Sequence, residues 1–391
     1  MKLAKLLTIL ISLILAFLIL EGASRVFLDK NKVPAIGEED SRIGIKYKKN
    51  LDINFPAENN KGTVRLKTNT YGFVGPNWNL KKDPEVIRIA NIGDSFTAGL
   101  AVPYTKNYVT VLGNHLSEIL HKKIESLNFG ISGQGTEDSR KTYESYAKQF
   151  NPDVVILWMY TGNDFTDNIK DLPKENVAVV NASLALKPTE SGGKNKSFLK
   201  TWIANSALWQ LIKKAAIKSE FAHAVFNFAI HTPILKNIAY KTVFYEYTLP
   251  TEIRVAFTDA DIAAYKTAVL QTKKYLEALK NNMVRDGKYF FVMILPPQFE
   301  VDTSAENRLF QEYSDLKSVY FNKDKPNTDL NKILLDLKIP YVDLKNDFTT
   351  VCQNQDNCSL YVCRYCHLSE DGHSAAGSLA AHALLKNYFK K

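Results

Sequence analysis

The stretch "VIRIANIGDSFTAGL", residues 86–100, decides the fold of this chain. Its first half is an almost continuous apolar run, which is typical of a strand covered on both faces. Its second half is a turn-like cluster that contains Ser95. In open α/β sheets, sites form beyond the carboxyl ends of the strands. Ser95 is therefore a candidate nucleophile, although a serine there can also be only the polar cap of the next helix.

The same pattern recurs along the chain. Four further apolar runs predict strands at 124–129, 154–159, 289–295 and 339–344. Apolar residues three or four positions apart predict amphipathic helices at 105–120, 258–283 and 374–388. Strands that alternate with helices specify a parallel sheet, so the sequence predicts an α/β fold.

The chain divides into three predicted parts. Residues 1–28 form an anchor, residues 29–80 form a linker and N-terminal extension with one or two strands, and residues 81–391 form the α/β domain. At about 168–256 the alternation stops, which predicts an insertion with a small hairpin and an aromatic-rich helical stretch.

The N-terminus predicts export. Lys2 and Lys5 precede an apolar run without a charged residue, residues 6–20, which indicates an uncleaved signal anchor. A cleaved signal peptide is the alternative, but Glu21 stands where a small residue is wanted before a cut. Both interpretations place the domain outside the cytoplasm, on the periplasmic or extracellular face. The first also makes the membrane a partner, through the N-terminal helix.

Composition excludes two other classes. The apolar fraction of 45% is ordinary for a packed globular protein and excludes general disorder. The net charge of +9 comes mostly from dispersed lysines. Because nucleic-acid binding needs clustered basic residues with interleaved aromatics, we expect no nucleic-acid partner.

The cysteines gather near the C-terminus, all within fifteen residues: Cys352, Cys358, Cys363 and Cys366. An even count in an exported protein favours two disulfides. A zinc site that includes the nearby His367 is an alternative, as are free thiols. Bridging would fix a loop near a histidine that the chemistry below uses.

Four polar segments that follow predicted strands carry groups suited to acyl transfer. They offer Ser95, Gly133, Asn163, and Asp371 with His373. A serine hydroxyl needs an imidazole to take its proton, and a carboxylate fixes the tautomer of that imidazole. The N–H groups of Ser95 and Gly133 and the side-chain amide of Asn163 would form the oxyanion hole.

These four blocks resemble those of the SGNH, or GDSL-like, hydrolases: "GDS", a glycine block, "TGND" and a terminal histidine block. The resemblance runs from about 86 to 388, interrupted by the insertion. It implies a flavodoxin-like α/β/α sandwich and hydrolysis or transfer of acyl esters, with no metal and no organic cofactor. The anchor followed by "EGASR" is also similar to membrane-tethered members of bacterial cell-envelope polysaccharide systems.

The predicted acid departs from the family pattern. The family places it three residues before the histidine, a position that Glu370 holds here. Asp371 lies two residues before His373, and its short side chain in a "DGH" turn suits direct contact with the imidazole. We therefore predict Asp371, with Glu370 as the alternative.

The sequence accordingly predicts a membrane-anchored serine esterase that cleaves acyl esters, acetyl esters foremost, on a small molecule or a cell-envelope glycan. An O-acyltransferase that passes the acyl group to a polysaccharide hydroxyl is one alternative. The other is a non-catalytic subunit of the same fold that binds protein partners in an envelope assembly.

Overall fold

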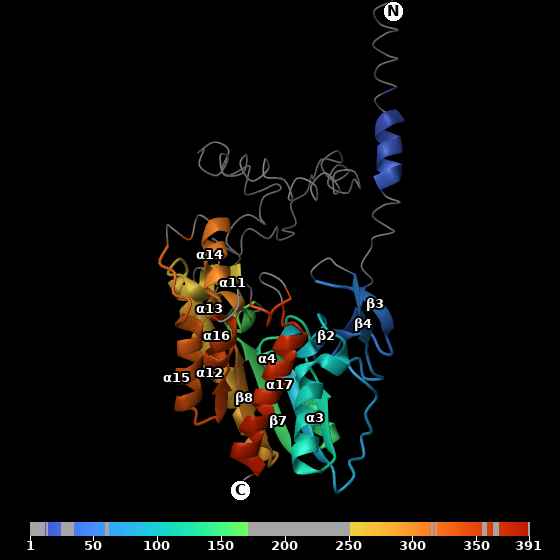
Figure 1. Cartoon of the computed structure of the whole chain (residues 1–391), viewed down its shortest axis with the longest axis vertical. Helices are drawn as coiled ribbons and strands as arrows, with labels where there is room; N and C mark the ends of the chain where they lie inside the picture. Colours follow the sequence, from blue (N-terminus) through green and yellow to red (C-terminus); the bar gives the residue numbers. More distant parts are fainter. Residues whose placement is uncertain are drawn as a thin grey trace, which may run out of the picture. The chain divides into compact units, whose positions relative to one another are not determined.

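The computed structural model describes residues 12, 15–24, 35–58, 62–170, 251–313, 316, 319–353, 358–362 and 367–389 (Figure 1). The chain divides into two compact units. Of the first, 1–34 and 182–248, the structure describes only residue 12 and residues 15–24, which are helical. The second unit, 35–181 and 249–391, contains all the other described residues.

The centre of the second unit is a five-stranded parallel sheet in the order β6-β5-β7-β8-β9. Its strands are β5 (Ile87–Gly93), β6 (Ile124–Asn128), β7 (Val154–Tyr160), β8 (Tyr289–Leu295) and β9 (Tyr341–Asp343). The register pairs Ile89 with Val154, and Trp158 with Met293. All five predicted strands are present within two residues of their expected bounds, which confirms the α/β fold class.

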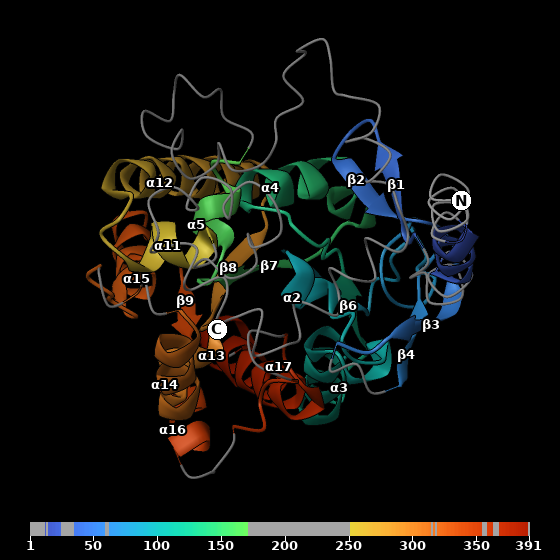
Figure 2. The same ribbon diagram turned by 90° about the horizontal axis from the view of Figure 1, so that it is seen from above.

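Helices cover both faces of the sheet (Figure 2). Helices α3 (Tyr108–Leu120) and α17 (Glu370–Leu384) pack together on one face, and α4 (Thr136–Ser145) and α12 (Ile262–Arg285) lie on the other. The sheet is thus the middle of three layers, as in the predicted sandwich. Because side chains alternate along a strand, each strand feeds both cores, and β7 is buried along nearly its whole length.

The second unit contains further described helices and helical turns. They are α2 (Ser95–Ala98), η1 (Tyr104–Lys106), η2 (Ala147–Phe150), α5 (Asp164–Asp167), α11 (Thr251–Phe257), α13 (Gln298–Val301), α14 (Thr303–Glu312), α15 (Lys325–Asp336), α16 (Lys345–Gln353) and the π-helical turn η7 (Leu385–Phe389).

The helix ends follow local chemistry. The predicted helix at 105–120 starts as α3 only at Tyr108, because Asn107 has an extended backbone and its side chain caps the N–H of Val109. The predicted helix at 374–388 starts earlier than expected, at Glu370, because the hydroxyl of Ser369 accepts from the N–H of Gly372.

The N-terminal extension contains more structure than the predicted linker. It forms two antiparallel hairpins, β1 (Gly37–Asp40) with β2 (Gly44–Tyr47), and β3 (Asp52–Pro56) with β4 (Thr63–Lys67). The hairpins are attached to the α/β domain: the hydroxyl of Tyr47 is 2.7 Å from that of Ser132, which follows β6. Segments 35–58 and 62–67 are therefore part of the same folded unit as the sheet.

Two other predictions lie mostly outside the described residues. Of the predicted insertion, residues 168–170 and 251–256 belong to the second unit, and the structure does not describe 171–250. Within the described residues, no helix is both long enough and apolar enough to span a bilayer. The signal anchor stays a prediction.

Candidate active site

Ser95 lies where β5 ends and α2 begins, at the carboxyl edge of the sheet. The side chain of Asp94 caps α2 by accepting from the N–H of Phe96 at 2.9 Å. A side chain at Gly93 would not fit, because a Cβ there would lie 2.3 Å from the hydroxyl oxygen of Thr97. This tight turn leaves Ser95 half-buried between buried neighbours.

The hydroxyl oxygen of Ser95 is 2.7 Å from Nε2 of His367. His367 lies in the loop before α17, where its carbonyl accepts from the N–H of Val362 at 3.0 Å. The imidazole also packs against the ring of Phe96, with ring centroids 4.7 Å apart. Nucleophile and imidazole are therefore in direct proton-transfer contact.

Glu58, two residues after the hairpin strand β3, contacts the other side of His367. Its Oε1 is bonded to Nδ1 of the imidazole, and its Oε2 accepts from the backbone N–H of His367 at 3.1 Å. Because a carboxylate only accepts, Nδ1 must carry a proton, which leaves Nε2 free to accept from Ser95. This is the tautomer that a base facing a serine requires.

The electrostatics agree with this arrangement. Burial alone would lower the pKa of His367, but the hydrogen bond and charge of Glu58 and the charge of Asp94 outweigh it, so that the pKa is raised from 6.5. Burial would raise the pKa of Glu58, but its bonds to His367 and the charge there hold it below its ordinary value. The pair thus stabilises an imidazolium next to Ser95.

The structure contradicts the predicted base, His373. Its side chain is fully buried in α17, where Nδ1 accepts from the N–H of Tyr108 at 3.2 Å and Nε2 has no partner among the described residues. Burial, with a smaller contribution from the charge of His367, lowers its pKa to about 3. His373 is thus a neutral residue that satisfies the first N–H of α3, rather than the partner of Ser95.

The structure also contradicts the two predicted acids. Asp371 and its alternative Glu370 are exposed in the first turn of α17, and neither contacts His367 through a described hydrogen bond or ion pair. Acidic residues at this position stabilise the helix through its dipole, which is a sufficient reason for their presence.

The sequence contains a pattern that indicates a packing role for His373. With Ala376, Gly377 and Ala380 it occupies positions i, i+3, i+4 and i+7, the spacing of one helix face, and those three residues are small enough for close packing. A Cβ at Gly377 would lie 2.8 Å from the carbonyl oxygen of Tyr108, so α17 and α3 do approach closely there. His367, considered only as a zinc ligand, precedes the helix and is free to turn toward the strand ends.

Glu58 was not predicted, and no motif marks it. It lies 37 residues before Ser95, in a segment interpreted as a linker, and only the three-dimensional position of the β3–β4 hairpin brings it to the imidazole.

Besides Ser95, the other two of the three predicted oxyanion donors follow strands adjacent to β5. Gly133 follows β6, has a φ of +76°, and has open space where a Cβ would be. Asn163 follows β7, and its Nδ2 donates to Asp167 at 2.9 Å. The loop after β6 packs on α2, since a Cβ at Gly130 would lie 2.3 Å from the N of Ala98. That these groups bind an oxyanion with the N–H of Ser95 stays a prediction.

Cys352 and Cys358 form a disulfide, and both are buried. The predicted disulfide is thereby confirmed for this pair, whereas Cys363 and Cys366 lie outside the described residues. Tyr361, which follows the bridge, donates its hydroxyl to the carbonyl of Pro296 at 2.7 Å. The bridge and this bond attach the loop before His367 to the sheet edge. The described residues include no group of three or more ligands placed for a metal ion.

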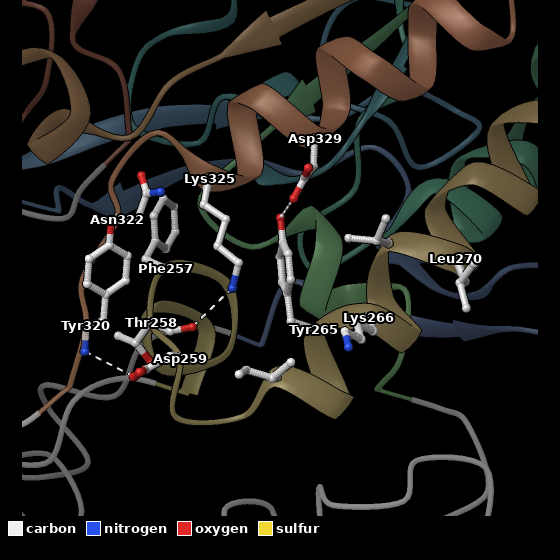
Figure 3. A pocket seen from close by; sticks show the side chains of 12 residues that line it. Phe257, Thr258, Asp259, Tyr265, Lys266, Leu270, Tyr320, Asn322, Lys325 and Asp329 are labelled. Carbon is white, nitrogen blue, oxygen red and sulfur yellow. Dashed lines mark hydrogen bonds between the residues drawn. The ribbon is translucent and has the colours of Figure 1, made fainter.

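A large cavity lies apart from these residues. It has a volume of about 750 Å³ and is lined by residues of α11, α12 and α15 and the loops beside them, none of which belongs to the serine site (Figure 3). Lys325 lies 3.7 Å above the ring of Tyr265 and donates to the carbonyl of Thr258, while the hydroxyl of Tyr265 donates to Asp329 (Figure 3). Several of its polar groups are thus bonded to one another.

Residues 89–187 match the family model of GDSL-like lipases and acylhydrolases. This match contains Ser95, Gly133 and Asn163 and ends before His367. It confirms the predicted family resemblance for that part of the chain. No curated protein matches the chain in sequence.

Solved structures of esterases are similar at low identity. A putative lipolytic protein of the G-D-S-L family from Desulfitobacterium hafniense is 14% identical, with 76% of this chain and 99% of that one covered and a TM-score of 0.36. A lipase/acylhydrolase from Enterococcus faecalis is 12% identical, over 76% and 95%, with a TM-score of 0.39. A variant of an acetyl xylan esterase from Geobacillus stearothermophilus is 14% identical, over 79% and 96%, with a TM-score of 0.37.

Proposed function

We propose, from the GDSL-like lipase/acylhydrolase domain that the chain carries at residues 89–187, that it is a serine ester hydrolase with the triad Ser95, His367 and Glu58. One observation supports this most: the 2.7 Å contact between the Ser95 oxygen and Nε2 of an imidazole whose Nδ1 is bonded to Glu58. A serine and a histidine that only pack together would not need a carboxylate on the far ring nitrogen.

The reaction has two halves. Ser95 Oγ attacks the ester carbonyl while Nε2 of His367 takes its proton, and the imidazolium then protonates the departing alcohol. Water next attacks the acyl-serine with His367 again as base, and the acid is released. Glu58 stays ionised throughout, because its lowered pKa keeps the carboxylate paired with the imidazolium.

The charge that develops on the carbonyl oxygen requires donors. We assign these to the N–H of Ser95, the N–H of Gly133 and the side-chain amide of Asn163, which follow three neighbouring strands β5, β6 and β7. Loss of one such donor typically costs about 10²–10³-fold in kcat.

For the substrate, we propose an acetyl ester on a cell-envelope glycan. This rests on the N-terminal apolar segment, which predicts export from the cytoplasm, and on the family resemblance. Attack by a sugar hydroxyl in place of water would make the same site an O-acyltransferase. The complete triad argues against a non-catalytic subunit.

The test uses the full-length chain in detergent with p-nitrophenyl acetate and a fluorophosphonate probe. We expect hydrolysis and covalent labelling, both lost in Ser95→Ala and in His367→Asn. An acetylated oligosaccharide, with an unacetylated one as acceptor, separates hydrolysis from transfer by the products formed. If the Ser95→Ala variant is as active as the native chain, the proposed mechanism is wrong.

A further inference from the structure

One short segment, residues 163–170, contacts both loops that carry the assigned oxyanion donors. At its start, the Nδ2 of Asn163 donates to Oδ2 of Asp167 at 2.9 Å. At its end, the Nζ of Lys170 donates to the carbonyl oxygen of Gly133. The segment therefore connects a donor that follows β7 with the peptide that follows β6.

A buried amide fixes the middle of this segment to the same loop. Asn168 accepts from the N–H of Thr136 at 2.7 Å, and donates to the hydroxyls of Thr136 and Thr272 at 3.0 and 2.8 Å. A Cβ at Gly135 would lie 3.1 Å from the carbonyl carbon of Asp167 and 3.2 Å from the backbone N of Asn168, so the two backbones are in close contact. Thr136 stands only three residues after Gly133, so the distance between the two loops is fixed next to the donors.

The side chain of Asn163 depends on Asp167 for its orientation. Its Oδ1 is buried and accepts no hydrogen bond from the described residues, so the bond from Nδ2 to Asp167 selects one of two amide orientations. In that orientation the second N–H of the amide remains for the substrate. Burial raises the pKa of Asp167 to about 7, a cost that the charge of Lys170 partly offsets.

Lys170 connects segment 163–170 to the loop after β6 and to α4. Besides the Gly133 carbonyl, its ammonium pairs with Oδ2 of Asp138 at 3.2 Å, in the first turn of α4. The Gly133 carbonyl lies in the plane of the peptide that joins Gly133 to Gln134. A cation bound to it restrains that plane, which is adjacent to the peptide that holds the N–H of Gly133. Lys170 is a third exposed, so its effect is positional rather than a large gain in stability.

We propose that Asp167 and Lys170 are positioning residues of the oxyanion hole, which orient Asn163 and the Gly133 peptide against the Ser95 acyl centre. This inference rests on the proposed function. Its physical basis is that oxyanion donors act only when they are held in place before the charge develops. A displacement of about 1 Å can cost about 10²-fold in rate.

The test is a double-mutant cycle on ester hydrolysis by the full-length chain. Asp167→Ala should lower kcat about tenfold to a hundredfold with KM changed less than about twofold, because it removes the acceptor that orients Asn163 and the hole acts in the transition state. In the Asn163→Ala background, Asp167→Ala should have almost no further effect, since the amide that it orients is gone. If Asp167 had only a structural role, the two losses in kcat would instead multiply.

Lys170 is tested separately. Lys170→Met should lower kcat about tenfold, and Lys170→Arg should restore most of it by keeping a cationic donor. Lys273→Met is the matched control, because Lys273 has a comparable exposure and an ion pair with Asp336 at 3.1 Å. We expect that control to keep the native kcat.

The outcomes separate the two proposals. If Ser95-dependent hydrolysis is found but the Asp167 and Asn163 losses multiply, or Lys170→Met behaves as Lys273→Met does, the positioning role is wrong and the enzyme stands. If no variant or native chain hydrolyses any ester through Ser95, both proposals are wrong. Thermal unfolding of each variant identifies a loss of kcat that comes only from misfolding.

Discussion

Separate substitutions of the two histidines near α17 distinguish the observed site from the one that the sequence suggests. His367→Asn removes the imidazole that contacts Ser95 at 2.7 Å. His373→Leu removes a buried imidazole of similar size that contacts no part of the nucleophile. The first change should abolish turnover, and the second should reduce only stability.

The magnitudes follow from what each change removes. Without its base, a serine hydrolase loses about 10⁵–10⁶-fold in kcat, which corresponds to about 7–8 kcal/mol of transition-state stabilisation. His373→Leu removes one 3.2 Å bond and leaves the buried N–H of Tyr108 without a partner, at a cost of about 1–3 kcal/mol in the free energy of unfolding. The Nε2 of His373 adds no further loss, since no described residue bonds to it.

The assay measures kcat and KM with p-nitrophenyl acetate, and the urea midpoint from tyrosine and tryptophan fluorescence. We expect His367→Asn to be inactive with a native midpoint. His373→Leu should stay within about fivefold of the native kcat with a lower midpoint. A folded His373→Leu with no turnover, or an active His367→Asn, would refute the assignment of the base.

Three further predictions follow from the same contacts. Glu58→Gln should lower kcat about 10³–10⁴-fold. Because Glu58 raises the pKa of His367, the acid limb of the kcat/KM profile should also move to lower pH in this variant. An acid limb that stays in place in a pH series would contradict this prediction. In the folded chain the pKa of His373 is about 3, below the ordinary 6.5. Its contribution to the free energy of unfolding is therefore complete above about pH 6.5 and is lost as the pH falls toward 3. Urea titrations should show that His373→Leu loses less free energy of unfolding than the native chain over this pH window. Cys352→Ser, compared with the native chain, should lower the free energy of unfolding by about 2 kcal/mol, because it opens a short loop; equal urea midpoints would show that the bridge is not formed.

The sheet could be predicted because its signal is local. Each central strand is covered on both faces, so a continuous apolar run such as β7 marks its bounds without knowledge of its neighbours. Ser95, Gly133 and Asn163 could be proposed as site residues for the same reason, since each belongs to a segment that follows such a run; the oxyanion role of Gly133 and Asn163 stays a prediction. Helix starts were less certain, because a cap such as Asn107 or Ser369 competes with similar residues a turn away.

The histidine and the acid could not be predicted in this way, because their positions depend on tertiary contacts. "HLSEDGH" offers two histidines six residues apart, and only the start of α17 decides which one enters the helix and which remains in the loop. Ser369 caps the helix between them, so that His373 is committed to the buried face against α3 and His367 stays free for Ser95.

The position of Glu58 has a consequence for where the catalytic unit begins. A boundary at residue 81, as the strand pattern suggests, would keep the whole sheet, Ser95 and His367, yet remove the carboxylate that orients the imidazole. The same cut would remove the 2.7 Å bond from Tyr47 to Ser132, which lies next to Gly133. The β3–β4 hairpin is therefore as much a part of the proposed active site as the strand ends are. The orienting acid reaches the imidazole from outside the repeating α/β pattern, so the loop before α17 needs no acid of its own.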